Sequence, residues 1–340
     1  MRLLVTGGMG FIGSNFIRQI LEKYPSYSVV NLDKITYGNP ETLRDFSSHP
    51  KYRFVKGDIC DKDAVDSAIK DVDAVVHFAA ESHVENSIYD PYVFTQTNVL
   101  GTHTLLESAR QNGVKKFVHI STDEVYGNVH KGSVTETDRL HPTNPYSCSK
   151  AAAEFIARAY FLTYKLPLVI TRSSNNFGPF QHPEKMMPRF LTRLIDREKV
   201  TVHGTGMNIR DWLYVKDNCE AVDVILHQGE IGEVYNIAGE NEMTNLDITK
   251  RLLREMEKDE SHIMFVEDRL NNDWRYSLDC TKLKKIGWQR KGRFEDNLRE
   301  TVKWYKENAW WWRELKSPVA NRYGHCGYEM VKRTGAGQIS

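Results

Sequence analysis

The sequence predicts an α/β protein: a doubly wound parallel sheet with helices on both faces, joined to a smaller interleaved α/β domain. Three observations carry this prediction. Short apolar runs alternate with helical patterns through the first half of the 340 residues, as in successive β-α-β units. The run at 74–78 is apolar almost throughout, which is typical of a strand buried on both faces. After residue 174, turn-forming residues break the alternation, which predicts the smaller domain.

A glycine-rich turn follows the first predicted strand. Gly7-x-x-Gly10-x-x-Gly13 opens a helix, and such glycines allow a close backbone approach to a pyrophosphate at the positive end of the helix dipole. The next strand ends at Asp33, whose carboxylate can accept hydrogen bonds from an adenosine ribose and would repel a 2′-phosphate. This order of elements predicts an NAD(P)-binding Rossmann fold and favours NAD over NADP as the cofactor.

The remaining elements follow from apolar spacing and turn residues. In the first part we expect strands at 2–6, 28–32, 53–55, 74–78, 117–120 and 168–171, and helices at 14–23, 61–70, about 91–112 and around residues 146–150. In the second part we expect helices at 189–196, 217–228 and 245–258, while 215–217 and 233–237 could return to the first sheet. We therefore predict a cofactor domain at 1–174 with returning segments near 213–237, a discontinuous substrate domain at 175–316, and a tail at 317–340 without an assigned role.

Two short motifs contain the candidate catalytic residues. Thr122, Asp123 and Glu124 directly follow the strand at 117–120, and ligands bind at the carboxyl ends of strands in open parallel sheets. Tyr146 and Lys150 have the i, i+4 spacing of one helix face, and a nearby cation favours an ionised phenol. Two carboxyl groups with different pKa values can divide the roles of acid and base. The motifs therefore predict proton removal from a sugar hydroxyl, coupled to a second step that needs both carboxyls.

Composition and charge exclude several classes of protein. A formal net charge of +1 gives no electrostatic basis for binding nucleic acid or an anionic membrane. The sequence has no metal-ligand spacing such as C-x-x-C, and no second ligand stands near His83, so no metal is expected. We expect a cytoplasmic protein, because no secretory signal or long apolar span is present and the cysteines are scattered. They are Cys60, Cys148, Cys219, Cys280 and Cys326.

Longer motifs carry a resemblance to a known family. They are Thr6-Gly7-Gly8-Met9-Gly10-Phe11-Ile12-Gly13-Ser14-Asn15, His77-Phe78-Ala79-Ala80-Glu81-Ser82-His83-Val84, Ser174-Asn175-Asn176-Phe177-Gly178-Pro179, Pro183-Glu184-Lys185 and Arg210-Asp211-Trp212-Leu213-Tyr214-Val215. With the two catalytic motifs, these make residues 1–316 resemble the nucleotide-sugar 4,6-dehydratases of the extended short-chain dehydrogenase/reductase superfamily. The triplet Thr122-Asp123-Glu124 is similar to that of the members that act on dTDP-glucose.

The resemblance implies oxidation, elimination and reduction on one sugar. Tyr146, as a phenolate supported by Lys150, takes the proton of the C4 hydroxyl while hydride passes to NAD, and Thr122 is hydrogen-bonded near that hydroxyl. Glu124 then takes the C5 proton, and protonated Asp123 donates to the departing C6 hydroxyl. Hydride returns to C6, so NAD is expected to remain bound as a prosthetic group. The implied product is a nucleotide-linked 4-keto-6-deoxy sugar.

The resemblance also implies the binding residues. For NAD they are Gly7, Gly10, Phe11, Ile12, Gly13, Asp33, Lys34, Thr36, Asp58, Ile59, Ala79, Ala80, Ser82, Tyr146 and Lys150. For a nucleotide-diphosphate hexose they are Ser82, His83, Ser87, Thr122, Asn175, Asn176, Glu184, Lys185, Arg210, Asn245, Arg269 and Asp273. Arg210 and Arg269 are expected at the diphosphate, because guanidinium groups match phosphate oxygens. His83 also suits a packed position that holds the cofactor loop. Relatives form homodimers through helices that correspond to 91–112 and 146–164, and a homodimer is expected here.

Two segments depart from the pattern of the dTDP-glucose enzymes. They are Glu85-Asn86-Ser87 and residues 269–276, and the second is closer to the enzymes that act on UDP-glucose. The resemblance therefore favours dTDP-glucose and leaves UDP-glucose as an alternative. A nucleotide-sugar epimerase or decarboxylase is opposed by the pair Asp123 and Glu124, and a catalytically silent NAD-binding protein by the retention of Thr122, Tyr146 and Lys150. The run Trp310-Trp311-Trp312 is expected to pack a terminal helix, and helical spacing prevents all three from facing one way.

Overall fold

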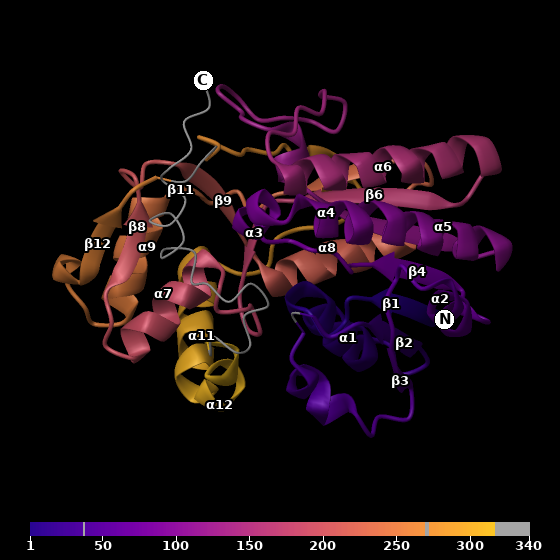
Figure 1. Cartoon of the computed structure of the whole chain (residues 1–340), viewed down its shortest axis with the longest axis horizontal. Helices are drawn as coiled ribbons and strands as arrows, with labels where there is room; N and C mark the ends of the chain where they lie inside the picture. Colours follow the sequence, from indigo (N-terminus) through magenta and orange to yellow (C-terminus); the bar gives the residue numbers. More distant parts are fainter. Residues whose placement is uncertain (37, 269–271, 317–340) are drawn as a thin grey trace.

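A seven-stranded sheet dominates the computed structural model, which describes residues 1–36, 38–268 and 272–316 (Figure 1). The strand order is β10-β6-β5-β4-β1-β2-β3. The strands are β1 (Arg2–Thr6), β2 (Ser28–Asp33), β3 (Tyr52–Lys56), β4 (Ala74–His77), β5 (Lys116–Thr122), β6 (Leu168–Ser173) and β10 (Val234–Ile237). Every neighbouring pair runs parallel, which confirms the predicted doubly wound sheet and the return of residues 233–237 to it.

The strands of this sheet are buried on both faces. In β4, Val76 packs in the core beneath helices α1 and α8, while Val75 packs in the core beneath α2, α5 and α6. The helices are α1 (Phe11–Lys23), α2 (Lys62–Ile69), α5 (Thr102–Gln111), α6 (Pro145–Tyr164) and α8 (Val215–Gln228). Burial on both faces therefore explains why the run at 74–78 does not alternate between apolar and polar residues.

Two smaller sheets lie beside the large one, on the left of Figure 1. One has the order β11-β9-β7, and the other pairs β12 with β8. Their strands are β7 (Asn175–Phe177), β8 (Val200–His203), β9 (Ile209–Tyr214), β11 (Glu242–Thr244) and β12 (Ile263–Val266). Helices α7 (Met186–Ile195), α9 (Asn245–Glu255) and α11 (Phe294–Glu307) pack with these sheets, and short helices complete the described chain. These are η1 (Pro40–Phe46), α3 (Val84–Tyr89), α4 (Pro91–Phe94), η2 (Thr95–Gly101), η3 (Asp123–Tyr126), η4 (Glu260–His262), α10 (Thr281–Lys285), α12 (Ala309–Trp312) and η5 (Glu314–Lys316).

The helix expected at 91–112 is not a uniform α-helix. It consists of α4, the π-helical η2 and α5 in succession. Inside η2, Asn98 accepts a hydrogen bond from the backbone N–H of Glu81 at 2.8 Å and donates to the carbonyl of Glu81 and to Ser149 Oγ. A π-helical turn widens the helix, and such turns are frequent at functional sites. This tertiary bonding is the physical reason for the irregularity, and apolar spacing alone could not reveal it.

Residues 215–217 were expected to return to the first sheet, and they do so as the start of a helix and not as a strand. They are the first turn of α8, where Val215, Cys219 and Val222 are buried at helical spacing. The segment still returns to the large sheet, because α8 packs against α1 on one of its faces.

The three consecutive tryptophans near residue 310 point in different directions, as helical spacing requires. Trp310 is 51% exposed, while Trp311 and Trp312 are buried. None of the helices in the described part of the chain has both the length and the apolarity that a membrane span needs. The predicted site residue Arg269, Cys326 and the tail 317–340 lie outside the described residues.

Candidate active site

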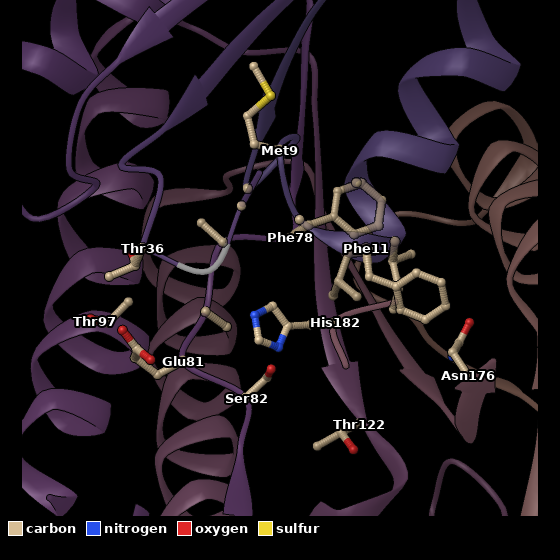
Figure 2. A pocket seen from close by; sticks show the side chains of 18 of the residues that line it. Met9, Phe11, Thr36, Phe78, Glu81, Ser82, Thr97, Thr122, Asn176 and His182 are labelled. Atoms are coloured by element: carbon tan, nitrogen blue, oxygen red, sulfur yellow. The ribbon is translucent and has the colours of Figure 1, made fainter. Parts of the chain in front are cut away.

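One cavity lies at the carboxyl ends of the strands of the large sheet (Figure 2). Its walls contain all the predicted cofactor residues: Gly7, Gly10, Phe11, Ile12, Gly13, Asp33, Lys34, Thr36, Asp58, Ile59, Ala79, Ala80, Ser82, Tyr146 and Lys150. The catalytic candidates Thr122, Asp123 and Glu124 line the same cavity. In Figure 2, Thr36 lies toward one end and Thr122 toward the other, with His182 between them. The fold therefore gathers both predicted sets of residues in one continuous space.

The turn between β1 and α1 leaves space for a ligand backbone. Gly7 has a φ of +72°, and a Cβ placed there would lie 2.6 Å from the backbone nitrogen of Ala79. A Cβ on Gly13 would lie 2.4 Å from the carbonyl oxygen of Gly7, so only glycine fits either position. The N-terminus of α1 begins at Gly10 and has no side-chain cap. An anionic group can therefore approach its backbone N–H groups, and these features fit the pyrophosphate of a dinucleotide.

Asp33 is fixed at the end of β2. Its two carboxylate oxygens accept hydrogen bonds from the backbone N–H groups of Met9 at 2.9 Å and Ile35 at 2.7 Å. Burial nevertheless raises the pKa of Asp33 above its ordinary value. Each oxygen keeps a second lone pair, so the carboxylate can still accept a hydrogen bond from a ribose hydroxyl.

The strand β5 and the short helix η3 position the carboxyl pair. Thr122 Oγ1 donates to Asp123 Oδ1 at 3.2 Å and accepts from the backbone N–H of Glu124 at 3.3 Å. Asp123 is buried, and its Oδ2 has no hydrogen-bond partner among the described residues. Asn144, which caps α6, donates to Glu124 Oε2 at 3.4 Å. The two carboxyl groups are thus held next to each other at the carboxyl end of the buried strand β5.

The surroundings of the two carboxyls differ in charge. Burial and the negative charges of Glu124 and Asp211 raise the pKa of Asp123 well above its ordinary value. Burial also raises the pKa of Glu124, but the positive charges of Arg210 and Lys185 oppose that increase. Asp123 is therefore the better candidate for a protonated acid, and Glu124 the better candidate for an ionised base.

Helix α6 brings Tyr146 and Lys150 beside the carboxyl pair. Lys150 Nζ donates to the carbonyl of Ile120 at 2.6 Å, and burial lowers its pKa to about 8. The expectation that the lysine would lower the pKa of the phenol is not met. Burial and the charges of Glu124 and Asp123 raise the pKa of Tyr146 above its ordinary value, although a hydrogen bond with Thr122 acts in the opposite direction.

Part of the predicted substrate set lines the cavity: Ser82, Thr122, Asn175, Asn176, Glu184 and Lys185. The Oδ1 atoms of Asn175 and Asn176 are buried and have no hydrogen-bond partner among the described residues. Lys185 Nζ donates to the carbonyl of Ser82 at 2.6 Å and so joins two walls of the cavity. The two amide oxygens can accept hydrogen bonds from a polar ligand, and Lys185 adds a positive charge to the cavity wall.

The structure does not bring the rest of the predicted substrate set into the cavity wall. His83 caps α3 and accepts from the N–H of Asn86, and Ser87 donates to the carbonyl of Val84. Asn245 begins α9, with its Oδ1 buried and without a hydrogen-bond partner among the described residues. The substrate roles of these three residues remain predictions.

Arg210 and Asp273 are tied to each other outside the cavity wall. Arg210 donates to the carbonyl of Asp273 at 2.9 Å and lies 4.5 Å above the ring of Tyr276. The Asp273 carboxylate accepts from Asn128, Thr143 and Tyr276. Arg210 still lies close enough to oppose the increase in the pKa of Glu124, so it contributes to the electrostatics of the site.

Several residues of the cavity wall were not predicted: Met9, Leu32, Gly38, Gly57, Phe78, Glu81, Thr97, Ile120, Ser121, Ser173, Ser174, Phe180, Gln181, His182 and Trp311. Many of them lie inside or next to the quoted motifs, and those motifs could have been extended to include them. Trp311 is different, because it comes from α12, near the end of the described residues, and no local pattern connects it to the turn at Gly7.

Glu184 gives the protein a predicted pH dependence. Burial raises its pKa from 4.5 to about 7, with Lys185 opposing the increase. The stability it contributes is fully present below pH 4.5 and is lost as the pH rises through about 7. Raising the pH from about 5 to about 8 should therefore lower the free energy of unfolding of the wild type. The same change should lower that of Glu184→Gln by on the order of 2–3 kcal/mol less.

Urea denaturation at several pH values measures this difference. Asp66→Asn is the control, because Lys62 lowers the pKa of Asp66 and keeps that carboxyl ionised throughout the window. Equal pH slopes for the wild type and Glu184→Gln would contradict the prediction.

Comparison with known proteins gives concordant matches. The model of the family described as GDP-mannose 4,6 dehydratase matches residues 4–301. The chain is 50% identical over 306 residues to the low-salt glycan biosynthesis protein Agl12 of Haloferax volcanii, covering 90% of this chain and 98% of that protein. It is 46% identical over 324 residues to a dTDP-glucose 4,6-dehydratase of Streptomyces niveus, covering 94% of this chain and 96% of the relative. The crystal structure of DesIV, a dTDP-glucose 4,6-dehydratase from Streptomyces venezuelae with NAD and TYD bound, superimposes with a TM-score of 0.91 at 48% identity, covering 93% of this chain and 100% of that one.

Proposed function

We propose that this chain, which belongs to the GDP-mannose 4,6-dehydratase family, converts dTDP-glucose to dTDP-4-dehydro-6-deoxy-glucose and water with NAD as a prosthetic group. The observation that carries the proposal is the carboxyl pair Asp123 and Glu124, which lies in one cavity with Tyr146 and with a glycine turn that fits a dinucleotide. Relatives of similar length with dTDP-glucose 4,6-dehydratase activity support the choice of substrate. UDP-glucose is the alternative substrate for the same chemistry.

Oxidation at C4 is the task of Tyr146 and Thr122. When bound, NAD supplies an acceptor for the C4 hydride and returns that hydride to C6 at the end of the reaction. Tyr146 accepts the proton of the C4 hydroxyl, and Thr122 positions that hydroxyl by a hydrogen bond. The raised pKa of Tyr146 makes its phenolate a strong base once it forms, and the hydrogen bond with Thr122 opposes that increase.

Elimination across C5 and C6 is the task of the two carboxyls. The C4 carbonyl acidifies the C5 proton, which the Glu124 carboxylate takes. The C5–H electron pair forms the C5–C6 double bond, and the C6–O bond breaks as Asp123 donates its proton to the departing hydroxyl. Water leaves, hydride then adds to C6, and a proton returns to C5. The surroundings of the pair support this division, because burial and anionic neighbours raise the pKa of Asp123, while Arg210 and Lys185 oppose the increase at Glu124.

Two other functions use the same fold. A nucleotide-sugar epimerase or decarboxylase needs the phenol and the cofactor but has no use for two adjacent carboxyls at C5 and C6. A silent NAD-binding protein has no use for Thr122, Tyr146 and Lys150 together in one cavity. The arrangement of the carboxyl pair favours the dehydratase over both.

Parallel incubation of the purified protein with dTDP-glucose and UDP-glucose, without added NAD, tests the proposal. Mass spectrometry should find a product lighter by one water, formed faster from dTDP-glucose. Faster dehydration of UDP-glucose would show that uridine is the preferred nucleoside, and the proposed reaction would stand. If neither sugar loses water while the protein carries NAD, the dehydratase proposal fails.

We also propose that the protein is a homodimer. Large apolar side chains are exposed on α3, α4, η2 and α6, which pack together: Tyr89, Tyr92, Leu100, Phe155, Leu162 and Tyr164. A second copy of this face would cover them, as expected from the helices at 91–112 and 146–164. Phe155, which is 62% exposed, lies on α6 within this face.

Phe155→Glu should raise the dimer dissociation constant by at least about tenfold, because it places charges in an apolar contact. Light scattering over a dilution series measures the change. Phe265→Glu is the control, since Phe265 is similarly exposed but lies on β12. A dimer that is unchanged in Phe155→Glu would contradict this interface.

Three narrower assignments complete the proposal. We assign the cofactor to the part built on the seven-stranded sheet and the nucleotide sugar to the part built on the smaller sheets. We assign NAD rather than NADP, because the buried Asp33 disfavours a 2′-phosphate. We place the protein in the cytoplasm, which suits the four described cysteines, all of them free thiols.

A further inference from the structure

We propose that Trp311 retains the cofactor by holding a strap, residues 38–46, against the dinucleotide cavity. The strap consists of Gly38, Asn39 and the helix η1. This inference rests on the proposed function to the extent that the retained ligand is NAD. It gives a role to the second of the three consecutive tryptophans, for which the reaction itself has no use.

The strap forms part of the cavity wall next to the glycine turn. Gly38 lines the cavity together with Met9. A Cβ on Gly38 would lie 2.6 Å from the Cβ of Met9, so the strap packs directly on the turn between β1 and α1. Because the strap follows Asp33 closely in the chain, a dinucleotide held at Asp33 and Gly10 would lie beneath it.

Trp311 binds the strap through two buried hydrogen bonds. Its Nε1 donates to Thr42 Oγ1 at 3.0 Å, and its carbonyl accepts from Asn39 Nδ2 at 3.1 Å. Trp311 and Thr42 are almost completely inaccessible to solvent, and Asn39 is buried. These bonds join residues about 270 positions apart in the chain.

Aromatic packing fixes the indole of Trp311 in place. Its ring lies 5.3 Å from that of Trp304 in α11 and 5.6 Å from that of Phe180, which also lines the cavity. Arg18 of α1 lies between the rings of Phe46 and Phe180 and donates to the carbonyl of Thr42. Residues of both α1 and α12 therefore hold the strap.

This arrangement has a kinetic consequence. If the strap must move away from Met9 before a dinucleotide can leave, the two Trp311 bonds must break first, and each is buried away from competing water. Retention of NAD is then a property of the C-terminal helices as well as of the glycine turn. A prosthetic cofactor requires such retention, because it must survive every turnover.

The test measures NAD release from the purified holoenzyme. Trp311→Phe keeps an aromatic ring but removes the N–H donor and leaves Thr42 Oγ1 without that partner. Release of NAD during dilution and gel filtration should become about 5- to 30-fold faster, the effect of losing one buried hydrogen bond. Thr42→Val removes the acceptor of the same bond, so combining the two substitutions should add little to either one alone.

Trp312→Phe is the matched control. Trp312 is equally buried in the same helix, and its Nε1 donates to the carbonyl of Tyr305 at 2.8 Å, in α11 and away from the strap. Faster release in Trp311→Phe and Thr42→Val, with release in Trp312→Phe close to the wild type, supports the proposal. Equal release from Trp311→Phe and Trp312→Phe, at equal thermal stability, overturns it.

The readout also separates this inference from the proposed function. Released nucleotide is quantified chemically, so it does not depend on dehydration. If Trp311→Phe retains NAD like the wild type while both dehydrate the sugar, the strap proposal fails and the proposed function stands. If the wild-type protein binds no nicotinamide dinucleotide at all, the proposed function fails, and the retention role fails with it.

Discussion

Asp123→Asn is expected to lower kcat about 10²- to 10⁴-fold and, at neutral pH, to raise the free energy of unfolding. The loss of activity follows from the removal of the acid that protonates the departing C6 hydroxyl. The gain in stability follows from burial, because Asp123 is 3% exposed and its Oδ2 has no hydrogen-bond partner among the described residues. Asparagine keeps the shape and the acceptor for Thr122 and cannot become charged.

The sign of the stability effect follows from the direction of the pKa shift. Burial and Glu124 raise the pKa of Asp123 in the folded protein well above its unfolded value of 3.8. Its contribution to stability is therefore present below pH 3.8 and is lost as the pH rises through the folded pKa. Asparagine does not titrate and has no such loss. The free energy of unfolding of the variant should therefore increase relative to that of the wild type as the pH rises from about 4 to about 8.

Steady-state kinetics and urea denaturation over this pH range measure the two effects. Asp138→Asn is the control: Asp138 is an exposed carboxyl whose pKa is lowered by hydrogen bonds from Thr135, and its substitution should leave kcat unchanged. An Asp123→Asn variant with wild-type kcat would refute the acid role. A variant that is less stable than the wild type at neutral pH would refute the account of the buried charge.

Glu154→Gln is expected to destabilise the protein by about 3–5 kcal/mol. Arg172 of β6 donates to both carboxylate oxygens of Glu154 in α6, with the closest contact at 2.6 Å, and both side chains are buried. Arg172 also donates to the hydroxyl of Tyr126 at 2.7 Å. Removing the negative charge would leave the guanidinium buried without its counter-ion.

This ion pair connects the two catalytic segments. Glu154 lies in the helix of Tyr146 and Lys150, and Tyr126 lies in the short helix that begins with Asp123. Destabilisation should therefore be accompanied by lower kcat. Equilibrium urea unfolding measures the change. Glu307→Gln breaks the exposed pair with Lys303 and should cost no more than about 1 kcal/mol. Similar losses of unfolding free energy in Glu154→Gln and Glu307→Gln would contradict a stabilising role for the buried ion pair.

The sequence predicted the features whose chemistry is local. Gly7 and Gly13 could be recognised because a close backbone approach leaves no space for a Cβ at either position, and Asp33 because it ends the next strand. The parallel strands were found for a similar reason: burial on both faces leaves near-continuous apolar runs. The sequence could not predict the π-helical turn at Asn98, since it depends on bonding to the distant Glu81 and Ser149.

The pKa shifts in the site, and the cavity residues that lie far from the motifs in the sequence, could be found only from the structure. The pKa of Tyr146 is raised because desolvation and two carboxylates act on the phenol, and neither burial nor distance can be read from the Tyr-x-x-x-Lys spacing. Trp311 reaches the cavity through the packing of α12 on the strap and on Phe180. Arg210 and Asp273 were predicted to bind the substrate. In the structure they contact each other and Tyr276, and they lie outside the cavity wall.

The central claim is that one tightly held NAD oxidises C4 and then reduces C6 of the same sugar. The most direct measurement uses dTDP-glucose that carries deuterium at C4, with purified protein and no added NAD. The claim predicts a product lighter by one water in which deuterium has moved to C6. A dehydrated product with hydrogen from the solvent at C6, or deuterium that remains at C4, would contradict it.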